Sequence, residues 1–266
     1  MLNNNFIYKS AKTGWIISKK QATKVAGFGL LGYQYLSGMG LFWKPDGKNL
    51  YIADNNTDFV YHITLSVAWD ITSTMTFVTQ LGVGNEAQGC ISGIFFSPDG
   101  SKMFVSSYAS GTVSVYSLIT AWTFTGYYSS VVQITLPGVS RSDSMSFTSD
   151  GLNVYTTDVT GGGKVYQHKL TTPFNLTTAT LFKSWTLAGV RVACIKPDGT
   201  HLYVLFDYSM VDYKLTTKND LSTAVSNDTT NVISGAWSTG LTFSPDGFNM
   251  YTVNSQYAQI YSAKLA

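Results

Sequence analysis

Few side chains in this 266-residue sequence could carry out acid–base chemistry. It contains 15 acidic residues, and its only glutamate is Glu86. Five of the acids are aspartates of one recurring turn, at positions 46, 99, 150, 198 and 246, and turn geometry explains their repetition. A glycosidase needs two carboxyl groups about 5 to 9.5 Å apart. Asp143 and Glu86 are candidates for such a pair because both lie in predicted loops that lead into strands, although loop carboxylates are also common on hydroxyl-rich surfaces.

The histidines and cysteines do not follow a metal-ligand pattern. His62, His168 and His201 fall on predicted strands of three different repeats, and Cys90 and Cys194 occupy non-equivalent positions in theirs. Neither a metal site nor a disulfide is predicted from this arrangement. The sequence also lacks a Gly-x-Ser-x-Gly elbow and a phosphate-binding loop. We therefore assign no catalytic residue, no metal and no cofactor, and we expect a protein that is not an enzyme.

A polar residue follows each turn aspartate by eight or nine positions, at the predicted end of a strand. These residues are Asp54, Ser107, Asp158, Asp207 and Asn254. On a disc-shaped fold they would form a ring on one face, where they could bind a ligand or an ion. Asp, Asn and Ser are also the residues that the ends of hairpins prefer, which is the alternative explanation of the pattern.

The elements that position these side chains are predicted from the recurring turn. The unit Phe96-Ser97-Pro98-Asp99-Gly100 has four close copies, at residues 43–47, 147–151, 195–199 and 243–247. Proline presets the turn, aspartate accepts hydrogen bonds from local amides, and glycine adopts the positive φ that follows. Short apolar and aromatic runs flank each copy, so each turn is predicted to join two strands of a hairpin.

The spacing of the copies predicts the fold class. Successive turn aspartates are 53, 51, 48 and 48 residues apart, and a repeat of this length with about four strands is typical of a β-propeller. We expect an all-β, five-bladed propeller with four-stranded antiparallel blades. The fifth copy ends at Ala266 after its third strand. Because an open ring would expose sheet edges, we expect a strand within Ala22–Leu31 to close it by pairing with residues 260–264.

The predicted domain organisation is an N-terminal arm at residues 1–21 followed by the propeller at 22–266, with repeats from about residue 39. Only 12% of the residues are charged, 44% are hydrophobic, and the net charge is +2. No basic stripe with interleaved aromatic residues occurs, so nucleic-acid binding is not predicted. Residues 25–43 are apolar but rich in glycine and tyrosine, which favours a strand and a loop over a membrane span.

The longer repeat resembles a known family. Each unit runs from Phe-Ser-Pro-Asp-Gly through Met-Phe-Val or Met-Tyr to Val-Tyr-x-Leu, and two copies continue into Ala68-Trp69 and Ala121-Trp122. The third and fourth copies depart here, with Pro173-Phe174 and Asn219-Asp220. The pattern resembles the repeats of β-propeller proteins of tailed bacteriophages, which occur in virion structural and host-adhesion proteins. It is more distantly similar to lactonase-type and surface-layer propellers.

The resemblance implies a non-enzymatic component of a bacteriophage virion, in a tail, a fibre or a capsid attachment. It implies no catalytic residues. We expect the apolar residues of the arm to dock into another virion protein, because an exposed apolar arm with little charge usually orders by adding to a partner. These residues are Phe6, Ile7, Tyr8, Trp15, Ile16 and Ile17.

Two alternatives stay open. One is a carbohydrate-binding adhesin, which would use aromatic residues such as Trp69, Trp122, Tyr127 and Tyr128 to hold a host-surface glycan, although the same residues suit the core between blades. The other is an enzyme of the lactonase or glycosidase class, with Asp143 and Glu86 as its acids.

Deleting residues 1–35 tests the predicted closure of the ring. The deletion removes the closing strand and exposes the edge of the fifth blade, so we expect an insoluble or molten product, judged by its soluble fraction and its thermal melt. A soluble product that melts cooperatively would refute the closure.

Overall fold

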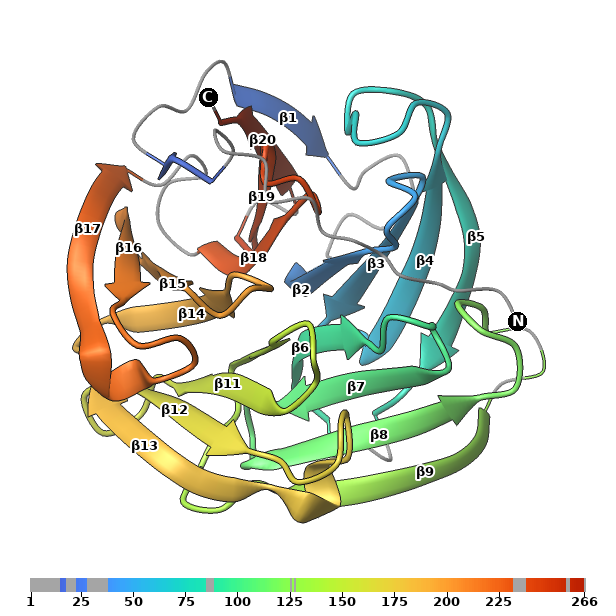
Figure 1. Cartoon of the computed structure of the whole chain (residues 1–266). Helices are drawn as coiled ribbons and strands as arrows, with labels where there is room; N and C mark the ends of the chain where they lie inside the picture. Colours follow the sequence, from blue (N-terminus) through green and yellow to red (C-terminus); the bar gives the residue numbers. More distant parts are fainter. Residues whose placement is uncertain are drawn as a thin grey trace, which may run out of the picture.

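The computed structural model describes residues 15–17, 23–27, 38–84, 89–124, 126, 128–231, 238–256 and 259–265. They form five four-stranded antiparallel sheets arranged in a ring (Figure 1). This confirms the predicted five-bladed β-propeller. The four strands of each blade are named A to D here, in order from the strand nearest the axis to the strand at the rim (Figure 1).

The blades follow the chain in order. Blade 1 consists of β2 (Gly38–Trp43), β3 (Asn49–Asp54), β4 (Phe59–Leu65) and β5 (Met75–Gly82). Blade 2 consists of β6 (Ile91–Phe96), β7 (Lys102–Ser107), β8 (Thr112–Leu118) and β9 (Tyr128–Thr135). Blade 3 consists of β10 (Ser144–Phe147), β11 (Asn153–Asp158), β12 (Lys164–Lys169) and β13 (Thr180–Thr186). Blade 4 consists of β14 (Val190–Ile195), β15 (His201–Phe206), β16 (Ser209–Leu215) and β17 (Ala224–Asn231).

Blade 5 is built from both ends of the chain. Its strands A to C are β18 (Ser238–Phe243), β19 (Asn249–Asn254) and β20 (Gln259–Lys264), and its outer strand is β1 (Thr23–Gly27). β1 runs antiparallel to β20, with Thr23 opposite Ala263 and Gly27 opposite Gln259 (Figure 1). The closing strand lies where the sequence predicted it, and it pairs with the predicted partner. It gives the fifth blade the fourth strand that the repeat requires.

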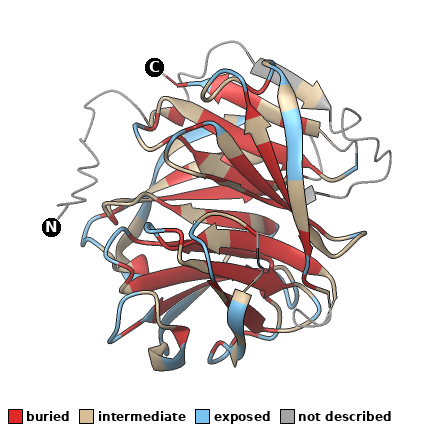
Figure 2. Ribbon diagram, turned by 90° about the vertical axis from the view of Figure 1, so that its right-hand side faces the viewer, coloured by how far each residue is buried: buried red, intermediate tan, exposed pale blue. Residues whose placement is uncertain are grey.

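Burial follows the distance of a strand from the rim. Every residue of β11, a strand B, is buried, whereas β13, a strand D, is exposed at six of its seven positions. Figure 2 shows the buried strands in the middle of the disc and exposed residues on its outer strands and loops. The low charge of the sequence is compatible with this arrangement because Ser and Thr cover much of the outer strands.

One side chain sits on the glycine of every Pro-Asp-Gly-type turn, and we call it the lid residue. The five pairs are Trp69 on Gly47, Trp122 on Gly100, Phe174 on Gly151, Asn219 on Gly199 and Trp15 on Gly247. In each pair the lid N–H donates to the glycine carbonyl, at N···O distances of 2.8 to 3.0 Å. A Cβ atom on any of these glycines would collide with its lid, and each glycine has a positive φ. The turn glycine is therefore fixed by two constraints, its backbone conformation and the packing above it.

The lid residues share a left-handed backbone conformation, which is unusual for the three tryptophans and for Phe174. Their φ angles are 80° at Trp15, 64° at Trp69, 65° at Trp122, 52° at Phe174 and 58° at Asn219. Positive φ is uncommon for a bulky residue. The hydrogen bond and ring contact with the turn glycine are what hold these residues there.

Trp15 shows that the fifth lid comes from the N-terminal segment. Two residues after each lid stands a buried apolar residue, and the set comprises Ile17, Ile71, Phe124, Leu176 and Leu221. Ile17 is 0% exposed and packs in the core of blade 5. Trp15 and Ile17 were expected to dock into a partner, but the structure places both in the chain's own propeller, with Ile16 half-buried between them. Phe6, Ile7 and Tyr8 lie outside the described residues.

The lid also ties neighbouring blades together. The hydroxyl of a strand B tyrosine donates to the lid carbonyl of the next blade, from Tyr51 to Trp122 at 2.5 Å, from Tyr203 to Trp15 at 3.1 Å and from Tyr251 to Trp69 at 2.8 Å. At the other two junctions, a side chain other than tyrosine donates the hydrogen bond to the lid carbonyl. Lys102 Nζ donates to the Phe174 carbonyl at 3.4 Å, and Gln167 Nε2 donates to the Asn219 carbonyl at 2.6 Å. Every junction between blades therefore has a hydrogen bond to a lid.

Across the ranges that the structure describes, no helix has the length and apolar character needed to cross a membrane. The division into an arm at residues 1–21 and a propeller from residue 22 stays a prediction, although residues 15–17 already pack on blade 5.

Two glycine substitutions separate the backbone constraint from the lid contact. Gly161 has φ +59° and open space around it, whereas Gly247 has φ +75° and Trp15 above it. We expect Gly161→Ala to cost about 1 kcal/mol, the penalty of a left-handed residue. Gly247→Ala should cost about 2 kcal/mol more because of overpacking against Trp15. Urea unfolding followed by fluorescence measures the free energy of unfolding of both variants. Equal losses of stability would show that the contact with the lid residue does not add to the cost of the substitution.

Candidate functional site

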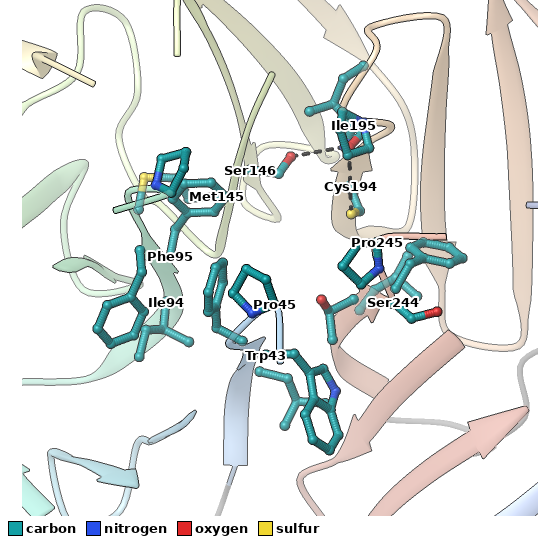
Figure 3. Close-up of a pocket in the computed structure, with 18 of the residues that line it drawn as sticks. Trp43, Pro45, Ile94, Phe95, Met145, Ser146, Cys194, Ile195, Ser244 and Pro245 are labelled. Carbon is teal, nitrogen blue, oxygen red and sulfur yellow. Dashed lines mark hydrogen bonds between the residues drawn. The ribbon is translucent and has the colours of Figure 1, made fainter. Parts of the chain in front are cut away.

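A cavity of about 130 Å³ lies on the propeller axis, on the face that carries the Pro-Asp-Gly turns. We call it the axial cup. Figure 3 shows side chains from several blades around its opening. The residues of its wall include Phe42, Trp43, Phe95, Phe96, Trp122, Met145, Ser146, Cys194, Ile195, Leu241, Thr242 and Phe243, with Pro45, Pro98, Pro197 and Pro245 at the turns.

The cup exists because one position of the repeat changes size around the ring. Four residues before the turn aspartate, blades 1 and 2 have Phe42 and Phe95, whose rings meet edge to face with centroids 5.2 Å apart. Blades 3, 4 and 5 have Ser146, Cys194 and Thr242 at the same position. Three small side chains leave empty the volume that three phenylalanine rings would fill. The result is a cup with an aromatic wall on one side and space on the other.

Several polar atoms in the wall of the cup already have partners within the protein. Ser146 Oγ accepts from the Ile195 N–H at 3.0 Å (Figure 3). It also donates to the Ala193 carbonyl at 3.2 Å. Ser244 Oγ donates to Asp246. Burial raises the pKa of the Cys194 thiol to about 12, so this group stays protonated and unreactive at neutral pH. The cup is therefore suited to holding an apolar group rather than to acid–base chemistry.

The channel narrows below the cup. Leu41, Ile94, Met145 and Leu241 line both the cup and a second, smaller cavity of about 20 Å³. Gly93 packs so closely at this level that a Cβ atom would meet Ser106 Oγ and the Met145 backbone. The four side chains therefore form a constriction, and the second cavity opens beyond it.

Asp143 lines this second cavity. Its Oδ1 accepts from Arg141 Nε at 2.7 Å, and its Oδ2 accepts from the Val159 N–H at 2.9 Å. Burial raises the pKa of the Asp143 carboxyl above its ordinary value, and the Val159 hydrogen bond and the Arg141 charge offset only part of that effect. Glu86, the other candidate acid, lies outside the described residues. The structure thus places one buried carboxyl group at the narrow end of the channel.

The predicted polar ring caps the hairpins between strands B and C. Asp54 Oδ1 accepts from the Thr57 N–H, Asp158 Oδ1 from the Thr160 N–H and Asn254 Oδ1 from the Gln256 N–H, at 2.8 to 2.9 Å. Ser107 Oγ accepts from the Ala109 N–H at 3.2 Å. These contacts explain why the pattern recurs. A ligand role for the ring stays a prediction.

Asp207 is not equivalent to the other four members of that ring. The strand register places Phe206 opposite Val190, in the position that Asp54 holds opposite Gly38. Asp207 lies one residue further on and forms an ion pair with Arg191 at 2.7 Å. Its side chain is 40% exposed, whereas Asp54, Ser107, Asp158 and Asn254 are buried.

The remaining candidates are distributed as single residues. His62, His168 and His201 lie in blades 1, 3 and 4, and the described part of the chain holds no group of three His, Cys, Asp or Glu side chains that could bind a metal. Both cysteines are unpaired thiols. Trp69 and Trp122 are lids, and Tyr128 packs edge to face on Tyr116. These contacts agree with the interpretation that the three aromatic residues pack in the core between blades. Tyr127 lies outside the described residues.

A family model described as "Lactonase, 7-bladed beta-propeller" matches residues 38–265, so the chain belongs to that family. It differs from the family's description in having five blades. The match supports the more distant of the two resemblances noted in the sequence, the lactonase-type propellers, and not the bacteriophage proteins. The family description names an enzyme activity, which does not favour the expectation of a protein without catalysis.

Solved structures share the fold at low sequence identity. A protein from Desulfotomaculum acetoxidans DSM 771, titled as functionally unknown, is 12% identical with a TM-score of 0.52, over 84% of this chain and 80% of that one. A chain of the mitotic checkpoint complex is also 12% identical with a TM-score of 0.50, over 85% of this chain and 60% of that one. No curated protein matches. These likenesses show the propeller fold alone.

Asp143 gives the candidate site a testable pH dependence. Because its pKa is raised in the folded state, the stability that it contributes is present at low pH and is lost as the pH rises from about 3.8 through the raised pKa. The stability of Asp143→Asn relative to the unmodified protein should therefore increase with pH over this range. Urea unfolding at a series of pH values measures the difference.

Asp99→Asn is the matched control. Burial acts to raise the Asp99 pKa, but hydrogen bonds from Ser97 and Ser101 outweigh it and hold the pKa below its ordinary value. The relative stability of this variant should therefore fall with rising pH. If the relative stability of both variants changed in the same direction with rising pH, the result would contradict a raised pKa at Asp143 and a lowered pKa at Asp99.

Proposed function

We propose that this chain is a binding propeller without catalytic activity, carried by a bacteriophage particle as part of a tail, a fibre or a capsid attachment. In this proposal the rigid disc makes contact with another virion protein or attaches to the host. The axial cup carries the proposal, because its aromatic wall and its internally bonded serines suit the binding of an apolar group.

The fold supports a role in contact rather than in movement. Five hydrogen bonds to lid carbonyls join consecutive blades around the ring, so the surfaces of the disc are held in fixed relation to one another. A preformed surface loses little conformational entropy on binding. The resemblance of the repeats to bacteriophage virion propellers supplies the biological setting of the proposal.

Imaging purified particles of a bacteriophage that encodes this chain, at side-chain resolution, tests the proposal. We expect the propeller in the particle, with the face that carries the cup against a neighbouring protein and an apolar side chain in the cup. A chain that is absent from the particles and purifies as a free monomer would overturn the proposal.

A second candidate is lactone hydrolysis, which the family match and the buried Asp143 favour. In this alternative Asp143, beside Arg141, would act on a substrate at the narrow end of the channel. The test is a screen of lactones with the purified protein and with Asp143→Asn. Hydrolysis by the unmodified protein that falls at least 100-fold in the variant would favour this candidate over the binding propeller, whereas no hydrolysis of any lactone would reject it.

A further inference from the structure

A third cavity, of about 130 Å³, lies at the junction of blades 4 and 5, and we call it the junction pocket. Its wall combines an aromatic and aliphatic side with a group of polar side chains. Its lining residues are Trp15, Ile16, Lys196, His201, Tyr203, Asp212, Asn227 and Asp228. Only Trp15 also lines the axial cup, so the two cavities are separate candidate sites.

The junction pocket lies beside a strand C position that differs in every blade. The residue opposite the central aromatic residue of strand B is His62 in blade 1, Val115 in blade 2, Gln167 in blade 3, Asp212 in blade 4 and Ser262 in blade 5. Gln167 reaches across its junction, donating to the Asn219 carbonyl and accepting from the Leu221 N–H. His62 stacks on Tyr51, with Phe124 of the next blade edge-on against it.

Asp212 is shorter and is held by groups of its own blade instead. Its Oδ1 lies 2.8 Å from His201 Nδ1, and its Oδ2 accepts from Asn227 Nδ2 at 2.7 Å. The carboxylate is 4% exposed. The two hydrogen bonds fix the planes of the imidazole and the amide at the pocket, so this polar group is arranged before any ligand arrives.

Asn227 owes its place to a β-bulge. The register of β16 and β17 shifts between Asp212 and Tyr213, so Asp212 lies opposite Asp228, Tyr213 opposite Ser226, and Asn227 is the extra residue. Blades 1 and 3 have a bulge at the equivalent position, with Val78 and Phe182 as the extra residues. The bulge of blade 2 lies two residues further along its strand C, between Ser117 and Leu118, with Ser129 as the extra residue. Bulges re-aim side chains, and here the bulge turns an amide towards a buried carboxylate.

The composition of this wall matches the chemistry of a sugar. A pyranose ring has an apolar C–H face that packs on an indole, and hydroxyl edges that bond to carboxylate, amide and imidazole groups. The junction pocket provides these three polar types beside an apolar wall of Ile16, Tyr203 and Trp15. The indole of Trp15 also packs on Gly247, Tyr203 and Phe243. Two carboxylates against one ammonium, Lys196, favour a neutral sugar over an acidic one.

We propose that the junction pocket binds one neutral pyranose unit, presented by a glycan of the host surface. This deepens the attachment function proposed above and rests on it for its biological meaning. The binding of the sugar itself is measured without reference to the particle, so the failure of one proposal is distinguishable from the failure of the other.

Saturation-transfer difference NMR on the full chain tests this proposal with the methyl glycosides of glucose, galactose, mannose and N-acetylglucosamine as probes. We expect transfer to at least one of them and none to sialic acid. Asn227→Ala should weaken that binding at least tenfold, because it removes an amide that is not part of the core. Ser129→Ala, at the bulge of blade 2, should bind with unchanged affinity.

Three outcomes would overturn the proposal. The first is transfer to none of the four glycosides by a folded protein. The second is equal affinity in Asn227→Ala and the unmodified protein. The third is binding that Asn227→Ala retains but that Phe95→Leu abolishes, which would assign the sugar to the axial cup. A thermal melt of each variant establishes that the fold is intact.

Discussion

The contact between a lid residue and a turn glycine is the constraint on which the rest of the propeller depends. It fixes a left-handed residue over a left-handed glycine, and in doing so it turns the lid carbonyl towards the preceding blade. There a tyrosine, a lysine or a glutamine donates to it. One local arrangement thus determines both the turn within a blade and the attachment between blades.

The sequence predicted most of the fold because the relevant chemistry is local. The turns around Pro98-Asp99-Gly100 and its copies specify hairpins through residues that are adjacent in the chain, and the incomplete fifth repeat required a closing strand. The role of Trp15 was missed because it is separated from its repeat by the length of the propeller. Its signal was present, since Trp15 and Ile17 have the spacing of Trp69 and Ile71.

The candidate sites were less predictable, because they depend on departures from the repeat. The recurring polar residues, such as Asp54 and Asp158, proved to be hairpin caps. Ser146 in place of phenylalanine opens the axial cup, and Asp212 lines the junction pocket at a position that differs in every blade. Such positions can be recognised in the sequence only after the register of every strand is known, and whether a smaller residue leaves a cavity depends on packing from neighbouring blades.

Blade 5 brings together strands that a ribosome makes far apart in time. β1 ends at Gly27 and β20 begins at Gln259, so at about 5 to 20 residues per second roughly 10 to 50 seconds separate their synthesis. During that interval the edge of β1 has no native partner, while blades 1 to 4 are completed one after another from consecutive strands. The nascent propeller is therefore an open arc until β20 emerges, and a chaperone that shields apolar segments would have its main task at β1.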